Sequence, residues 1–376
     1  MRVPVVDINA KALMPTKPGR ARRWIKEGKA IGKWSKLGIF YVQLKIESSD
    51  NKTQDIAVGI DPGKHFSGVA VQSKQATLFT AHLELPFKNV TKRLTQRAMM
   101  RRTRRSRRIN RKLPFNQRAH RQKRFNNRKQ GGMPPSIRSN KLLELRILKL
   151  ITDIFPVTDV VYEVVKARGD KGFSPVMVGQ KMMLEYLEVI KNKGYFKRVK
   201  TMQGFDTHLT RKHLNLEKEK GDKSLKIPQT HAVDGIALAA SKWISYGVTS
   251  TKSQAWRGEV KLTDCWFSVI SRPPVCKRQL HLLQCSKGGK RRKYGGSTTR
   301  HGFRKGDYVE AVKAGKTYRG WVSGDTVKMV AINDSNWKQG QYTASKVKLI
   351  KRSTGLVVTT SKLKPTALAE RDRKVI

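Results

Sequence analysis

Three acidic residues and one histidine occupy positions from which they could build a metal site that cleaves phosphodiesters. Asp61 ends a hydrophobic run and precedes a Pro-Gly turn, Glu163 lies within a Val-rich run, and His231 and Asp234 are three residues apart, on one face of an expected helix. Two divalent ions about 3.5–4 Å apart can activate water and stabilise the leaving oxygen of a phosphodiester. Mg²⁺ prefers oxygen ligands, so carboxylates at such positions favour this chemistry.

Each of these residues also has an ordinary structural explanation. An Asp-Pro-Gly sequence is common in turns, and a Glu in a strand can be explained by an ion pair. His231 and Asp234 could cap a helix or compensate its dipole. The occurrence of all four in this order favours the catalytic interpretation, with Asp61, Glu163 and Asp234 as metal ligands.

The elements that must position these residues form a regular pattern. Strands are expected at 55–63, 67–72 and 76–85, joined by short turns as in an antiparallel meander. The segments that follow alternate: helix 140–155, strand 159–166, helix 174–193, strand 196–202 and helix 231–245. This order predicts an α/β fold of the RNase H-like kind, a mixed sheet covered by helices.

Further units flank this core. Residues 1–50 predict a small α/β unit, with strands at 3–7 and 38–47 and a helix at 19–28. Short strands with Gly, Pro and Ser between them predict a basic, β-rich domain at 250–376. The expected domains are 1–50, 51–88, 89–130 (the Arg-rich helix), 131–249 and 250–376.

The net charge indicates a polyanionic partner. The chain has 80 Lys and Arg residues against 27 Asp and Glu, a formal net charge of +53. A compact protein with that charge repels itself unless a polyanion neutralises it, and nucleic acid fits better than an anionic membrane. No apolar run approaches the ~20 residues that span a bilayer, and the N-terminus lacks a signal peptide's apolar core. We expect a cytoplasmic protein that is associated with the nucleoid when it is bound to DNA.

One internal segment is exceptionally basic. Residues 88–129 contain no acidic residue, and helix-forming residues alternate with Arg over 90–112 before Pro114. We expect an arginine-lined helix that binds RNA phosphates; a basic disordered loop is the alternative. The arginines are Arg93, Arg97, Arg101, Arg102, Arg104, Arg105, Arg107, Arg108 and Arg111.

These motifs resemble a known family. The sequences 58–63 (VGIDPG), 161–163 (VYE) and 231–234 (HAVD) resemble the three split segments of a RuvC-like nuclease domain. The sequence 12–15 (ALMP) and the Arg-rich segment resemble the IscB/IsrB family of transposon-encoded, RNA-guided nucleases. Only 67 residues, 164–230, separate the second segment from the third, which leaves no room for an inserted HNH nuclease. The chain therefore resembles IsrB, the branch that lacks HNH.

The resemblance implies a function and partners. It implies a monomeric protein bound to a large structured guide RNA (omega RNA) that targets double-stranded DNA beside a short flanking motif. The arginine-lined helix would lie between guide RNA and nuclease, and the C-terminal β-rich domain would read the motif. The RuvC-like site would nick the displaced, non-target strand with two Mg²⁺ ions, or with Mn²⁺. Asp61 would bridge both ions, Glu163 and Asp234 would each complete one coordination sphere, and His231 would activate or orient the attacking water.

Several other residues have less specific expectations. Cys265, Cys276 and Cys285 are expected to be structural, although Cys276, His281 and Cys285 would be a conceivable zinc set. His208 and His213 are expected at the surface or in contact with RNA rather than as an HNH remnant. Trp256, Trp266 and Trp321 could stack on bases, but core packing is the expected role of each.

Two other functions are compatible with the sequence. The first is a non-catalytic RNA-binding scaffold with an RNase H-like fold, which Mg²⁺-dependent cleavage would exclude. The second is a guide-independent, structure-selective nuclease of the Holliday-junction kind, which would need neither the Arg-rich segment nor the basic C-terminal domain.

Overall fold

The architecture was determined from a computed structural model of the whole chain. It describes residues 1–47, 53–86, 94–96, 98–100, 102–103, 110–117, 133–166, 175–248, 253–273, 301–334 and 338–363. None of the helices in these ranges is long and apolar enough to cross a membrane.

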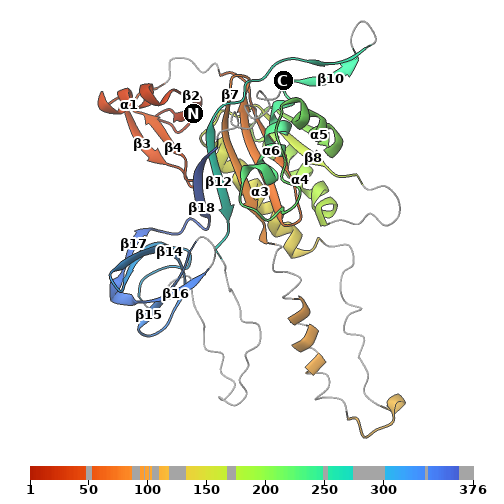
Figure 1. The fold of residues 1–376 in the computed structure, drawn as a ribbon, viewed down its shortest axis with the longest axis vertical. Coiled ribbons are helices and arrows are strands. Elements are labelled where there is room, and N and C mark those ends of the chain that lie inside the picture. Colours follow the sequence, from red (N-terminus) through yellow and green to blue (C-terminus); the bar gives the residue numbers. More distant parts are fainter. Residues whose placement is uncertain are drawn as a thin grey trace, which may run out of the picture.

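The N-terminal unit is a four-stranded sheet covered by one helix, at the upper left of Figure 1. Its elements are β1 (Val3–Val6), β2 (Ala12–Thr16), α1 (Pro18–Lys26), β3 (Ala30–Trp34) and β4 (Phe40–Leu44). The sheet order is β2-β1-β4-β3. The sequence pattern predicted β1, α1 and β4 but not β3, in which Ala30 alone is buried and no apolar alternation marks a strand.

A seven-stranded mixed sheet forms the centre of the molecule (Figure 1), in the order β18-β12-β7-β6-β5-β8-β9. Its strands are β5 (Ile56–Asp61), β6 (Phe66–Ser73), β7 (Ala76–Glu84), β8 (Asp159–Val164), β9 (Arg198–Gln203), β12 (Cys265–Ser271) and β18 (Val357–Leu363). The meander β5-β6-β7 is antiparallel, whereas β8 and β9 continue parallel to β5. The order β7-β6-β5-β8-β9, with only β6 reversed, is that of an RNase H-like fold, as the sequence predicted.

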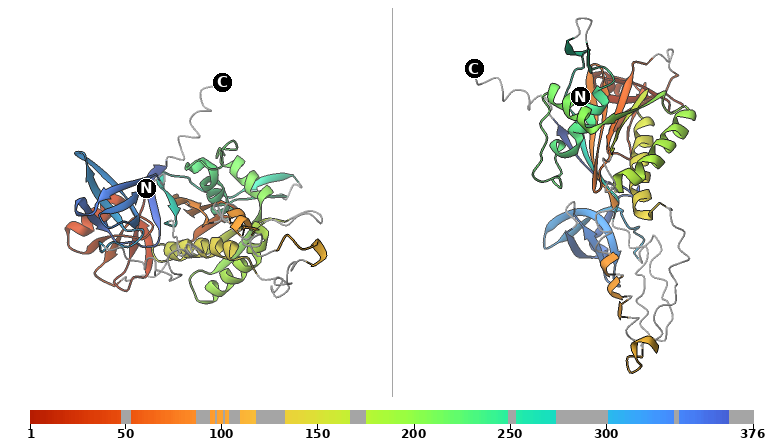
Figure 2. Two further views of the ribbon diagram at one scale, coloured as in Figure 1. Left: turned by 90° about the horizontal axis from the view of Figure 1, so that it is seen from below. Right: turned by 90° about the vertical axis from the view of Figure 1, so that its right-hand side faces the viewer.

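Helices cover both faces of this sheet (Figure 2). They are α3 (Pro135–Thr152), α4 (Pro175–Asn192), α5 (Gly204–His213) and α6 (Pro228–Ala240). The main core contains Leu143 and Leu148 of α3, Leu187 of α4, and Val58 of β5. A second core on the opposite face joins Ile236 of α6 to β6 and β12. Asp61 and its partners lie on the α6 face.

The C-terminal region is divided between two sheets. Residues 250–376 were expected to form a separate domain, but β12 and β18 pair with each other and extend the central sheet from β7. Alternating apolar residues mark β12 as a strand but do not identify the strand with which it pairs. A separate five-stranded antiparallel sheet consists of β13 (Tyr308–Lys313), β14 (Lys316–Asp325), β15 (Met329–Asn333), β16 (Gln339–Thr343) and β17 (Val347–Lys351).

Four short elements are also described. The strands β10 (Ser245–Val248) and β11 (Gln254–Arg257) form a two-stranded ribbon. The 3-10 helices are η2 (Phe115–Gln117) and η4 (Ala344–Lys346). Most of the expected Arg-rich helix 90–112 lies outside the described residues; within it, 94–96, 98–100 and 102–103 are helical.

Candidate active site

Asp61 and Glu163 end up side by side because their strands are parallel neighbours. Strands β5 and β8 pair in parallel, with Ile60 opposite Tyr162. The next residue on each strand is an acid, Asp61 on β5 and Glu163 on β8. Successive side chains of a strand alternate between faces, so both acids lie on the face that packs against α6. Two carboxylates therefore share one edge of the sheet.

Glycines allow α6 to approach this edge very closely. A Cβ on Gly59 would lie 2.1 Å from the carbonyl oxygen of Gly235, and a Cβ on Gly68 would lie 1.9 Å from that of His231. No side chain fits at either position, so the backbone of α6 rests directly on β5 and β6. This contact brings His231 and Asp234 to the sheet edge that carries the acids. Helix α6 begins at Pro228, earlier than the predicted 231, so His231 and Asp234 lie in its first two turns.

His231 faces Asp61. Its Nδ1 lies 3.6 Å from Oδ2 of Asp61, and its Nε2 lies 3.2 Å from the carbonyl oxygen of Lys223. A carbonyl oxygen only accepts hydrogen bonds, so Nε2 is the donor and a neutral ring presents the Nδ1 lone pair toward Asp61. The rings of Phe66 and His82 pack against the imidazole, with centroids 5.6 and 5.2 Å away. The ring is therefore held in an orientation suited to a base beside Asp61.

Glu163 is a crowded carboxylate. Its Oε2 accepts a hydrogen bond of 2.6 Å from the Thr207 hydroxyl of α5. Burial, together with the negative charges of Asp61 and Asp234, raises the pKa of Glu163 to about 7, against the lowering effect of Thr207. The repulsion shows that the three carboxylates lie close enough to interact electrostatically.

Asp234 is paired with two cations. Arg211 of α5 contacts its Oδ1, and Lys218, in the loop before α6, contacts its Oδ2. The guanidinium of Arg211 also lies 2.9 Å from Nδ1 of His208. Both oxygens of this buried carboxylate are thus neutralised by the protein itself.

The donor set fits a divalent cation, although its ligands are not assembled in this state. Within the described ranges, no three His, Cys, Asp or Glu side chains form a group arranged to hold a metal ion. Three carboxylates and an imidazole are nevertheless suitable ligands. Moreover, the side chains of Lys218 and Arg211 form ion pairs with Asp234, so positively charged groups already bind at this position. Asp61, Glu163 and Asp234 would hold the metal once Asp234 is released.

The structure thus places the four predicted residues at the same edge of the sheet, with Asp234 paired to Arg211 and Lys218. The sequence analysis did not identify Thr207, Arg211 or Lys218. Helix α5, which carries Thr207 and Arg211, was not predicted. In a chain with so many basic residues, no single Lys or Arg can be recognised as part of a site. Of the predicted RNA-binding arginines, only Arg102 and Arg111 fall within the described residues. Arg93, Arg97, Arg101, Arg104, Arg105, Arg107 and Arg108 fall outside them, as do Cys276, His281 and Cys285.

The remaining candidate residues are buried or pack against neighbouring side chains. His213 stacks on Trp256 with ring centroids 4.1 Å apart, and Tyr246 packs against the same indole at 5.3 Å. Trp266 packs against the main core, and Trp321 packs against Tyr308 with centroids 5.0 Å apart. Cys265 is buried, which raises the pKa of its thiol to about 12.

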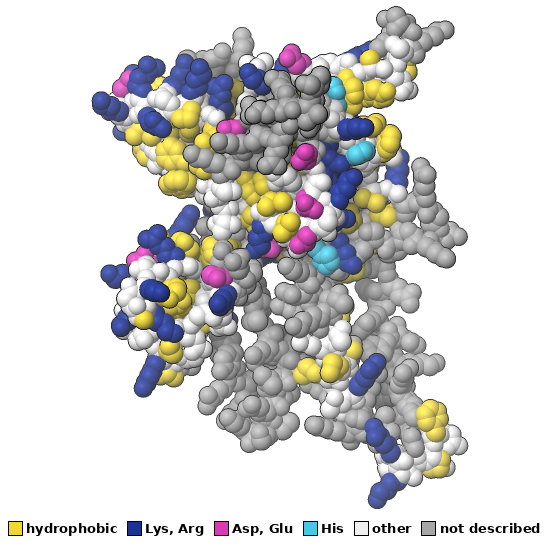
Figure 3. Space-filling model, in the orientation of Figure 1, with side chains coloured by type: hydrophobic (Ala, Val, Ile, Leu, Met, Phe, Trp, Pro, Cys, Tyr) yellow, Lys and Arg dark blue, Asp and Glu magenta, His cyan; other side chains and the backbone are white. Residues whose placement is uncertain are grey.

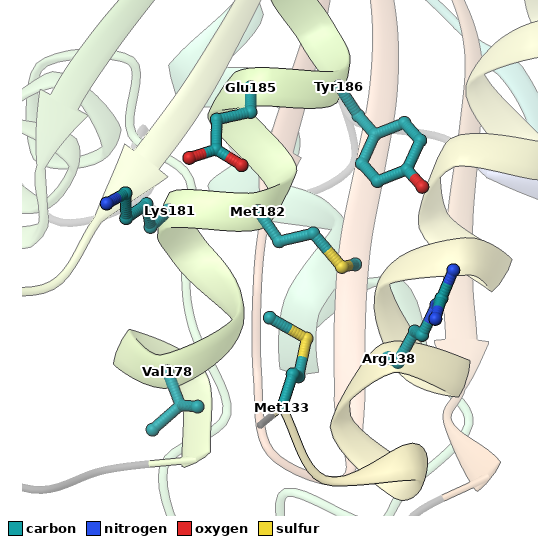
Figure 4. A pocket seen from close by; sticks show the side chains of 7 residues that line it. All are labelled: Met133, Arg138, Val178, Lys181, Met182, Glu185 and Tyr186. Carbon is teal, nitrogen blue, oxygen red and sulfur yellow. The ribbon is translucent and has the colours of Figure 1, made fainter. Parts of the chain in front are cut away.

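A separate pocket of about 550 Å³ lies between α3 and α4 (Figure 4). Its lining residues include none of the four site residues; they are Met133, Arg138, Val178, Lys181, Met182, Glu185 and Tyr186. Lys and Arg side chains instead cover much of the N-terminal unit and the five-stranded sheet (Figure 3), which is the distribution expected for polyanion binding.

Comparison with known protein families found one match. Residues 3–176 match the family model described as RRXRR protein, a range that includes Asp61 and Glu163 but ends before His231. No curated protein matches the chain significantly.

Solved structures that resemble the chain are Holliday-junction enzymes. RuvC of T. thermophilus in complex with a Holliday junction substrate is 10% identical, with a TM-score of 0.27, covering 50% of this chain and 90% of that chain. The yeast mitochondrial Holliday junction resolvase Ydc2 is 11% identical, with a TM-score of 0.25, covering 51% of this chain and 79% of that chain. The RNase H-like fold itself is established by the strand order of the central sheet.

Proposed function

We propose that the chain is an RNA-guided, divalent-metal-dependent DNA endonuclease that nicks the displaced strand of its target. The observation that carries this proposal is the convergence of Asp61, Glu163, His231 and Asp234 at one edge of an RNase H-like sheet. Repulsion among the three carboxylates is relieved when a cation binds between them. Such a group is the expected ligand set of a two-metal phosphodiesterase.

Each of the four residues would have its own role in phosphodiester cleavage. Divalent ions would supply an activated water and stabilise the leaving oxygen. Asp61, which lies near both His231 and Glu163, would hold the ions together with Glu163 and Asp234. His231 would accept the proton of the attacking water at Nδ1, because the Lys223 carbonyl occupies Nε2. Phe66 and His82 hold the ring in place during this transfer.

Two observations support the RNA-guided part of the proposal: the net charge of the chain and its match to the RRXRR family model. A net charge of +53 exceeds what a short DNA site requires and suits a large RNA together with DNA. The RRXRR family, matched over residues 3–176, is associated with IscB- and IsrB-like proteins. In such an arrangement base pairing selects the target, and the five-stranded sheet β13–β17 would read a flanking motif.

Purification from cells tests this part directly. The full chain, expressed with its native flanking DNA, should carry one abundant structured RNA, whose sequence identifies the guide. A supercoiled plasmid that matches the guide should be converted to the open-circle form in Mg²⁺, and a plasmid with a scrambled target should not. Cleavage of four-way junctions without RNA would support a structure-selective nuclease instead, and no cleavage in any metal would support a non-catalytic scaffold.

A further inference from the structure

A buried ion pair lies behind the candidate site, on the opposite face of the central sheet. Lys141 and Glu144 of α3 are 2% and 0% exposed. The Lys141 Nζ donates to Glu144 Oε2 at 2.9 Å and to the Tyr162 hydroxyl oxygen, also at 2.9 Å. Lysine is almost never fully buried unless it is paired. Here Glu144 and Tyr162 are the partners of Lys141, and we asked what such a costly arrangement supplies to the fold.

This ion pair connects to the turn that follows Asp61. The Ser67 hydroxyl of β6 donates to Glu144 Oε1 at 2.7 Å and accepts from the backbone N–H of Gly63 at 3.3 Å. We call Lys141, Glu144, Tyr162 and Ser67 the buried polar network.

Its two ends reach the turn after β5, through the backbone N–H of Gly63, and β8, through the side-chain hydroxyl of Tyr162. Gly63 is two residues after Asp61, and Tyr162 immediately precedes Glu163. The neighbouring Asn140 of α3 adds a hydrogen bond of 3.2 Å to the carbonyl oxygen of Lys64, in the same turn. Helix α3 therefore holds the end of β5 and the end of β8 through polar contacts.

Stability alone does not account for this network. Replacing a buried ion pair with apolar residues is often neutral or stabilising, because desolvation of two charges offsets their attraction. The neighbours Leu143 and Ile147 show that α3 otherwise packs through apolar side chains here. Helix α4 also leaves space for the lysine at Gly179, where a Cβ would lie 2.8 Å from Lys141 Cε. What the network supplies is directional contact, which apolar packing lacks.

We propose that the buried polar network sets the separation between Asp61 and Glu163, so that its members are positioning residues for the metal site. This inference rests on the proposed function, since it assumes that both carboxylates bind the same pair of ions. Mg²⁺ requires near-ideal octahedral geometry, and productive sites are held to within about 0.5 Å by their supporting residues. The network would provide that support from the far side of the sheet.

Two conservative variants test the inference in the full-length protein. Tyr162→Phe and Ser67→Ala each remove one hydroxyl of the network. Ser73→Ala is the matched control, because Ser73 is a buried serine at the other end of the same strand, with its hydroxyl bonded to the Ala76 carbonyl at 3.0 Å. The measurement is the Mg²⁺ concentration that gives half of the maximal metal-induced rise in Tm, followed by the same titration with Mn²⁺.

We expect Tyr162→Phe and Ser67→Ala to raise the Mg²⁺ midpoint by about tenfold, the low end for residues that orient metal ligands. The Mn²⁺ midpoint should rise less, and Ser73→Ala should leave both unchanged even where its Tm without metal falls. Unchanged midpoints in both variants, against a wild type that responds to metal, would overturn the positioning role and leave the nuclease proposal intact. A wild type that shows no metal response would overturn both.

Discussion

Gly59 of β5 and Gly235 of α6 face each other so closely that a Cβ on Gly59 would lie 2.1 Å from the carbonyl oxygen of Gly235. This contact joins the strand that ends in Asp61 to the helix that carries His231 and Asp234. The distance between the two halves of the candidate site is therefore set by two residues without side chains.

Gly59→Ala should push α6 away from the sheet. Overpacking of a filled core costs about 1–3 kcal/mol and more where backbone must move, so we expect at least that loss in the free energy of unfolding, together with loss of metal binding. Urea denaturation and a Mg²⁺ titration measure the two effects. Gly247→Ala is the control, because a Cβ at Gly247 meets nothing within 4 Å. A Gly59→Ala protein as stable as wild type would show that α6 does not need this contact.

Lys218 should compete with a metal ion for Asp234. Its ammonium group contacts the carboxylate directly, so Lys218→Ala should reduce the Mg²⁺ concentration required for half-maximal thermal stabilisation. An ion pair of this kind is worth up to about 1 kcal/mol, or about fivefold. Lys220→Ala, two residues along the same loop and exposed, should have no such effect. A higher Mg²⁺ requirement in Lys218→Ala would instead assign Lys218 a supporting role.

The stability of the metal-free protein should depend on the protonation of Glu163. The pKa of Glu163 is raised from its ordinary value of 4.5 to about 7 in the folded protein, mainly by burial and then by Asp61. A raised pKa means that the folded state binds the proton more tightly, so the contribution of Glu163 is fully present below pH 4.5 and is lost as the pH rises through about 7.

The comparison that isolates this effect is wild type against Glu163→Gln, with a chelator present. The difference in their free energies of unfolding should shift against wild type between pH 4.5 and 7 and then level off. Saturating Mg²⁺ should reduce the shift, because a bound cation favours the ionised carboxylate. A difference independent of pH would mean that Glu163 is not crowded by the other carboxylates.

The sequence located the elements that carry the candidate residues better than it predicted the surroundings of those residues. Periodicity located β5, β8 and α6, and the rules for parallel strands and helix faces are enough to bring Asp61, Glu163 and His231 together. Nothing local indicated that β12 would pair with β7, since strand pairing depends on tertiary contacts. The ion pairs of Asp234 with Arg211 and Lys218 could not be predicted either, because the chain has so many basic residues that no pair stands out.

The Arg-rich segment should bind RNA through phosphates. Replacing Arg102, Arg104, Arg105 and Arg111 with Gln should flatten the salt dependence of RNA affinity by about 0.7–0.9 log units of slope per lost contact. Binding isotherms at several salt concentrations give this slope. An equal number of Lys→Gln changes in the five-stranded sheet, at Lys313, Lys316, Lys348 and Lys351, provides a charge-matched control. Equal slopes for wild type and the Arg variant would remove this segment from the RNA interface.

The most direct measurement is metal-dependent nicking of a guide-matched plasmid by wild type and by Asp61→Ala, each purified with its RNA. The account predicts that wild type converts supercoiled plasmid to the open-circle form only with divalent metal. It predicts that Asp61→Ala binds the same RNA and target but does not nick. Nicking by Asp61→Ala at the wild-type rate would contradict the account.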